Sequence, residues 1–137
     1  MRNSTFVNPG VPNRFLARVS WALRILSAAA FMAAGIAKLA GASVMVESFE
    51  QIGIGQWFRV VTGLVEVIGA VAILVPATAA YAAIVLAITM FFAVLTHVFV
   101  IGGSSVAALA LLLVTAAIAW IHRASFAKLF GQFKGKT

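Results

Sequence analysis

The stretch from Trp57 to Pro76 constrains the fold of this chain most. It is an apolar run of membrane-spanning length with a single carboxylate, Glu66, close to its middle. About 20 such residues cross a hydrocarbon layer of ~30 Å as a helix, which puts Glu66 near the bilayer midplane. An acidic side chain at that depth costs roughly 2.5–3.5 kcal/mol on insertion scales. We therefore expect Glu66 to face the interior of a helix bundle and to have a polar partner there.

The composition of the whole chain supports this interpretation. Of its 137 residues, 64% are hydrophobic and 9% are charged, and the mean hydropathy is +1.11. A soluble domain carries about 25% charged residues, so the chain is predicted to be an integral membrane protein. The apolar runs predict an all-α, antiparallel four-helix bundle in a single domain, 19–121. Its spans are expected at about residues 19–41, 57–76, 78–100 and 106–121.

The basic residues lie mainly near the two ends of the chain. In a soluble protein the net charge of +7 would suggest a nucleic-acid partner. In a membrane protein, Lys and Arg gather in cytoplasmic segments beside anionic headgroups. We therefore expect both termini in the cytoplasm, the lipid bilayer as partner with no nucleic acid, and the inner (plasma) membrane of a bacterium as location. The residues concerned are Arg2, Arg14, Arg18, Arg24, Arg123, Lys128, Lys134 and Lys136.

Two tails are predicted outside the spans. Residues 1–18 contain Pro9, Gly10 and Pro12 and are expected to form a flexible cytoplasmic tail. Residues 122–137 are expected to form a basic amphipathic tail on the inner leaflet. Its apolar side chains recur at helical spacing. They are Phe126, Leu129, Phe130 and Phe133.

A cleaved signal peptide is the alternative interpretation of the first apolar run. Ala28, Ala29 and Ala30 would supply the small residues of a cleavage site. Arg24 interrupts what would be the apolar core of such a signal, and the run continues past the cleavage point. We therefore favour a first span.

The segment between the first two spans is predicted to be a short amphipathic helix on the outer interface. Between residues 42 and 56, apolar positions alternate with Glu47, Glu50 and Gln51. Glu47 and Glu50 are thus expected as outer-face charges. Arg59 is expected at the headgroup level or paired with one of them.

Four polar side chains are expected to form an intramembrane cluster. Side chains tilt toward the N-terminus of their helix, so Lys38 and His97 should lean inward from outer helix ends while Glu66 leans outward. Thr62 lies one turn above Glu66 and could donate a hydrogen bond to it. Two interpretations remain open. The cluster fixes helix register, with Glu66 neutralised by Lys38 or by a proton, or it lines a cavity that receives a quinone ring or relays a proton.

Several kinds of chemistry are excluded by residue content and position. The chain has no cysteine, which excludes disulfides and cysteine-held clusters within it. His97 and His122 should lie at opposite membrane faces, roughly 25 Å or more apart, so they cannot share one haem. One His with one Glu falls short of a metal ligand set. No cofactor is therefore expected to be built into the chain.

Several short motifs follow one another in a characteristic order. They are AGIAKL at 34–39, FEQIG at 49–53 followed by a Trp, TGLVEVIGA at 62–70 followed by a proline turn, and TH at 96–97. In their order and spacing the chain resembles the DoxX family of small four-helix membrane proteins, over about Trp21 to Trp120. The resemblance implies a four-helix bundle, an association with quinone-dependent oxidoreductase systems, and polar positions at Lys38, Glu66 and His97.

Two functional hypotheses follow. In the first, the chain is a membrane subunit of an oxidoreductase system, its polar cluster receives a quinone, and a partner subunit holds the redox cofactor. In the second, it is a non-catalytic scaffold that docks a partner protein or another copy of itself. The scaffold would use a small-residue stripe expected to pack against another span. That stripe is formed by Ala29, Ala33, Ala37 and Gly41.

Overall fold

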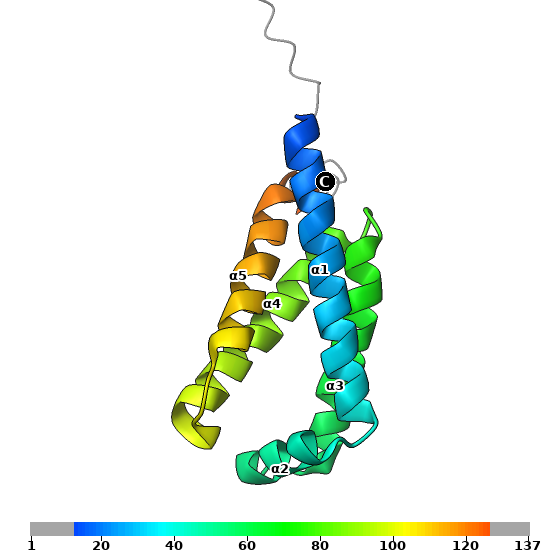
Figure 1. Ribbon diagram of the computed structural model, residues 1–137. Coiled ribbons are helices and arrows are strands. Elements are labelled where there is room, and N and C mark those ends of the chain that lie inside the picture. The colour runs from blue at the N-terminus through cyan, green and yellow to red at the C-terminus, as the bar shows by residue number, and fades with distance from the viewer. Residues whose placement is uncertain (1–12, 127–137) are drawn as a thin grey trace, which may run out of the picture.

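The computed structural model describes residues 13–126 and confirms an all-α fold, since these residues contain helices and no strand. The chain order is easily followed in Figure 1, where colour runs from blue to red along the chain. The elements are α1 (Arg14–Leu39), α2 (Ser43–Ile52), α3 (Gln56–Leu74), α4 (Ala79–Thr96), the π-helix η1 (His97–Ile101) and α5 (Val106–Ile121).

The first helix begins earlier than the sequence suggested. Asn13 acts as its N-cap, because its side-chain oxygen accepts a hydrogen bond of 3.2 Å from the backbone nitrogen of Phe15. Residues 14–18 are therefore helical, and assigning them to a flexible tail was wrong. Residues 1–12 lie outside the described residues, as does the tail from 127 to 137 with Leu129, Phe130 and Phe133.

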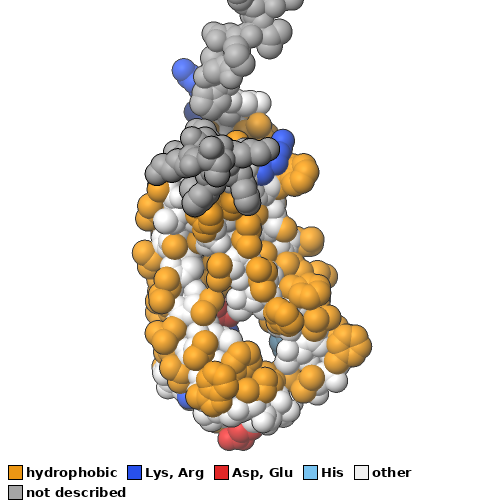
Figure 2. All heavy atoms as spheres, turned by 180° about the vertical axis from the view of Figure 1, so that it is seen from behind, with side chains coloured by type: hydrophobic (Ala, Val, Ile, Leu, Met, Phe, Trp, Pro, Cys, Tyr) orange, Lys and Arg blue, Asp and Glu red, His pale blue; other side chains and the backbone are white. Residues whose placement is uncertain are grey.

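Three helical stretches are long and apolar enough to cross a membrane. They are α1, α3, and α4 together with η1. The fourth apolar helix, α5, has 16 residues and is shorter than the ~20 needed to cross a hydrocarbon layer of ~30 Å. Large apolar side chains are exposed on all of these helices, and Figure 2 shows many of them on one face of the molecule. Such a surface suits lipid, so the chain is an integral membrane protein.

The helices form two limbs that meet at one end and separate at the other (Figure 1). α1 packs along α3 in one limb, and α4 packs along α5 in the other. The limbs meet at the end of the bundle where α1 begins and α5 ends. At the open end, α2 lies across the gap and contacts both α3 and η1. The two limbs thus diverge toward α2 (Figure 1).

Two glycines allow α1 and α3 to approach closely. A Cβ atom on Gly35 would lie 2.9 Å from the carbonyl oxygen of Gly63, and a Cβ atom on Gly63 would lie 3.2 Å from that of Gly35. No side chain fits between backbones at these distances. The contact therefore uses a different face of α1 from the predicted stripe, of which Ala29 and Ala33 are exposed.

The apolar core occupies the half of the bundle where the limbs meet. Phe31, Ile73, Leu86 and Ile118 come from four different helices, and each is fully buried. Their contact joins α1, α3, α4 and α5 into one unit. The packed half holds the limbs together, and the half toward α2 remains open for a cavity.

A candidate intramembrane site

A cavity of about 520 Å³ lies between the two limbs. Figure 2 shows it as a hollow in the apolar surface, with acidic and histidine side chains at its walls. Its lining is mostly apolar, and all four residues of the predicted cluster border it. Those residues are Lys38, Thr62, Glu66 and His97. Binding sites for small molecules have this character, being 300–1,000 Å³ in typical volume and apolar with a few polar groups.

Lys38 and Glu66 form an ion pair in the wall of the cavity. The ammonium nitrogen of Lys38 lies 2.7 Å from Oε2 and 3.0 Å from Oε1 of Glu66. The side chain of Glu66 is 2% exposed and that of Lys38 is 13% exposed. An ammonium group has three N–H donors. Because two of them point at the carboxylate, the third can serve a ligand in the cavity.

Arg59 holds the end of α1 against α3. Its Nη1 donates to the backbone carbonyl of Lys38, and its Nε donates to the side-chain oxygen of Gln56 at 2.7 Å. A cation at a helix C-terminus satisfies a free carbonyl there and complements the helix dipole. Within residues 13–126 Arg59 therefore does not form the ion pair expected with Glu47 or Glu50. Arg59 instead fixes the residue that carries the cavity's ammonium group.

The hydroxyl of Thr62 does not serve Glu66 as expected. It donates instead to the carbonyls of Phe58 and Arg59 in its own helix, at 3.1 and 3.0 Å. Thr89 and Thr96, which also line the cavity, bond to their own helix in the same way. A hydroxyl has one hydrogen, so these oxygens can accept a hydrogen bond from a ligand but have no donor left.

His97 borders the cavity from the other limb. It begins the π-helix η1, and its Nδ1 lies 3.3 Å from the carbonyl oxygen of Gly102. Single π turns occur often at functional sites, where they alter the direction of a side chain. Within residues 13–126 His97 forms no ion pair with Glu66. The imidazole and the ion pair thus face the same space from different limbs.

The two glutamates of α2 lie away from the polar cluster. Glu47 and Glu50 are exposed and do not line the cavity. Residues 13–126 contain no group of three acidic or histidine side chains able to hold a metal ion.

The structure also reveals a polar contact that the sequence did not indicate. Arg24 is 2% exposed, and its guanidinium donates from Nε to the carbonyl of Ile73 and from Nη2 to that of Leu74, both at 2.6 Å. These are the last carbonyls of α3, which have no partner inside their helix. The signal available in the sequence was a single arginine within an apolar run. That signal does not say which helix the arginine caps.

Comparison of the sequence with known protein families agrees with this architecture. The sequence model of a family described as the DoxX-like family matches residues 22–124. The chain belongs to the DoxX-like family. This confirms the resemblance inferred from the order of the motifs, and the match includes every residue of the intramembrane cluster. A search of curated proteins and a search of solved structures found no match to this DoxX-like chain.

Proposed function

We propose that this DoxX-like protein is a membrane subunit of a quinone-linked oxidoreductase system and that its cavity receives the quinone headgroup. The observation that carries the proposal is the ion pair of Lys38 and Glu66 in the wall of a mostly apolar cavity that His97 also borders. A charged pair is costly within a membrane, so it is commonly kept where it binds or moves something.

The polar groups of the cavity fit the shape of a quinone. A quinone ring is flat and apolar and has carbonyl oxygens on opposite sides. The cavity offers polar groups on different limbs, namely the remaining N–H of Lys38 on one and the imidazole of His97 on the other. Apolar side chains between them, including Phe31 and Phe58, would cover the ring faces.

The chain's own residues would bind the quinone, orient it and supply protons to it. A bound quinone would supply the acceptor for two electrons, with the redox donor held by a partner subunit. Lys38 would orient one carbonyl while Glu66 keeps the ammonium in place. His97 would exchange a proton with the ring, which is general acid–base work. The threonine hydroxyls bonded to their own helices add no competing donor.

The first test measures quinone retained through purification in mild detergent. We expect wild-type protein to retain about one quinone per chain, and Glu66→Gln and His97→Ala to retain about a tenth of that. Glu66→Gln frees the Lys38 ammonium from its position and His97→Ala removes a polar partner of the ring, and each loss is worth roughly 1–1.5 kcal/mol. Glu50→Gln and His122→Ala are matched controls, since neither residue lines the cavity. Both should retain the wild-type amount.

Retention of quinone by both cavity variants at the control level would refute this role for the cluster. All variants should first be shown to be monodisperse in detergent, so that loss of quinone is not loss of fold. The same preparations address the scaffold hypothesis, which the exposure of Ala29 and Ala33 favours. A partner recovered equally with every variant, in the absence of quinone, would support the scaffold.

We further propose that both termini face the cytoplasm, in the inner membrane of a bacterium. Both ends of the described chain lie at the same end of the bundle (Figure 1), and most basic residues are near them. A reporter active only in the cytoplasm should work when fused after residue 137. A periplasmic reporter should work when inserted at 102–105. Periplasmic activity from the C-terminal fusion alone would reverse this orientation.

A further inference from the structure

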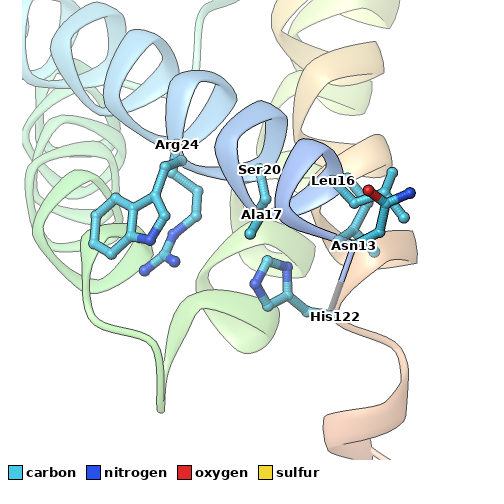
Figure 3. A pocket seen from close by; sticks show the side chains of 8 residues that line it. Asn13, Leu16, Ala17, Ser20, Arg24 and His122 are labelled. Atoms are coloured by element: carbon cyan, nitrogen blue, oxygen red, sulfur yellow. The ribbon is translucent and has the colours of Figure 1, made fainter. Parts of the chain in front are cut away.

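A second pocket lies at the opposite end of the bundle from the cavity between the limbs, which is called the quinone cavity below. It has a volume of about 300 Å³ and is formed by the first turns of α1 and the end of α5 (Figure 3). The side chains of Arg24 and His122 extend into it from these two elements. It is lined by Asn13, Leu16, Ala17, Ser20, Trp21, Arg24, Ile121 and His122.

Ser20 is a buried hydroxyl in this pocket without a hydrogen-bond partner. The residue is 5% exposed, and its Oγ has no partner among residues 13–126. Ser27, two turns later on α1, is equally buried, but its Oγ donates to the carbonyl of Leu23 at 2.7 Å. Burying a hydroxyl without a hydrogen bond is unfavourable. The unpaired Oγ of Ser20 therefore indicates a missing acceptor in the pocket.

Arg24 places a fixed positive charge beside that hydroxyl. Its Nε and Nη2 are held by the carbonyls of Ile73 and Leu74, and its guanidinium carbon lies 4.2 Å from the centre of the Trp21 ring. These partners are neutral, so the charge is not cancelled. Within the described residues Nη1 has no hydrogen-bond partner. It remains available to an anion.

No side-chain carboxylate can neutralise this pocket. The sequence has three acidic residues, Glu47, Glu50 and Glu66. Two are on α2 at the far end of the bundle, and the third is paired with Lys38. His122 lines the pocket as well, and its Nδ1 donates to the carbonyl oxygen of Ile118 at 2.9 Å. The site has positive character and calls for an anion.

The position of the pocket matches the headgroup level of a membrane. Arg24 contacts the last carbonyls of α3, where that span ends. From there α1 extends ten residues further to Arg14, or about 15 Å at 1.5 Å per residue, as its projecting end in Figure 1 shows. Arg14 and Arg18 on this projecting part are exposed. Phospholipid phosphates lie at this level.

We propose that the pocket formed by Ser20, Arg24 and His122 binds a phosphate group. The group is carried by a phospholipid headgroup or is free in solution. The hydroxyl of Ser20 and Nη1 of Arg24 donate to its oxygens, and guanidinium groups suit phosphate geometry. This site shares no lining residue with the quinone cavity, so the two proposals are independent of each other.

The test uses full-length protein in a maltoside detergent, which contains no phosphate. Two probes are added separately: phosphatidylglycerol, followed by native mass spectrometry, and inorganic phosphate, followed by phosphorus NMR. Ser20→Ala and Arg24→Lys are each expected to weaken binding about tenfold, since each removes one hydrogen-bond donor to the charged phosphate. Ser27→Ala is the matched control on the same helix and should bind as wild type does.

Each outcome decides the proposal. Binding of phosphatidylglycerol alone, reduced in both pocket variants, assigns the site to a lipid phosphate, and binding of inorganic phosphate with the same loss assigns it to a free one. Wild-type protein that binds neither probe overturns the proposal. It is likewise overturned if Ser20→Ala and Arg24→Lys bind as well as Ser27→Ala. Without a probe, Ser20→Ala should be no less stable than wild type, because its hydroxyl has no partner to lose.

Discussion

Replacing Lys38 with Ala is expected to lower the free energy of unfolding in detergent by about 3–5 kcal/mol, the loss typical of breaking a buried ion pair from one side. The reason lies in Glu66, whose residue is 1% exposed and whose two oxygens both accept from the Lys38 ammonium. Without that ammonium a carboxylate is left buried and unpaired. Thermal or denaturant unfolding of the purified variant would measure the effect.

The double variant Lys38→Ala with Glu66→Gln provides the control. The amide carries no charge to bury, so the double variant should be more stable than Lys38→Ala alone, and the difference measures the coupling. Equal stability of the single and double variants would mean that Lys38 and Glu66 are not coupled. The double variant also separates the two roles of the cluster. A pair kept for helix register alone would leave quinone retention unchanged.

Arg24→Leu is expected to cost about 2–4 kcal/mol of stability. Two hydrogen bonds from a charged donor are lost, each worth roughly 1.5–3 kcal/mol, and water at the membrane interface recovers part of that. The carbonyls of Ile73 and Leu74 would lose their partner at the point where α3 ends. Unfolding of the variant in detergent would measure the loss.

Arg18→Leu is the matched control for this prediction. Arg18 is on the same helix but is exposed, so its replacement should change stability by less than ~0.5 kcal/mol. The stability of Arg24→Lys should lie between those of Arg24→Leu and the wild type. An ammonium is a compact charge without the planar guanidinium that can donate to two carbonyls at once. If Arg24→Leu and Arg18→Leu unfold alike, Arg24 does not cap α3.

The helices and their order could be predicted because hydropathy decides them. Apolar runs separated by glycine, proline and charged residues gave the all-α bundle, and the proximity of Lys38 to Glu66 followed from helix direction and depth. What could not be predicted was which contacts the other polar groups make. Thr62 and Arg59 each had a carboxylate and backbone carbonyls within plausible reach. Sequence spacing does not choose between such partners.

The separation of the two limbs could not be predicted from the sequence either. Four antiparallel spans predict a bundle, but whether it closes along its whole length depends on side-chain size at each level. Gly35 and Gly63 bring α1 and α3 together, and Phe31 and Leu86 fill the end where the limbs meet. The cavity is what remains toward α2. The predicted stripe at Ala29 and Ala33 failed to identify the packed face, because alanine is common on every face of this helix.

The pairing of α1 with α3 makes assembly depend on the timing of synthesis. Lys38 and Glu66 are 28 residues apart, which corresponds to roughly 1–6 s at about 5–20 residues per second. During that interval the Lys38 ammonium lacks its native partner Glu66, and we expect it to extend to the membrane surface, as long basic side chains do. The guanidinium of Arg24 lacks its acceptors for longer, since Ile73 and Leu74 are synthesised 49 and 50 residues later. α1 can therefore pack along its partner helix only after the ribosome has synthesised α3.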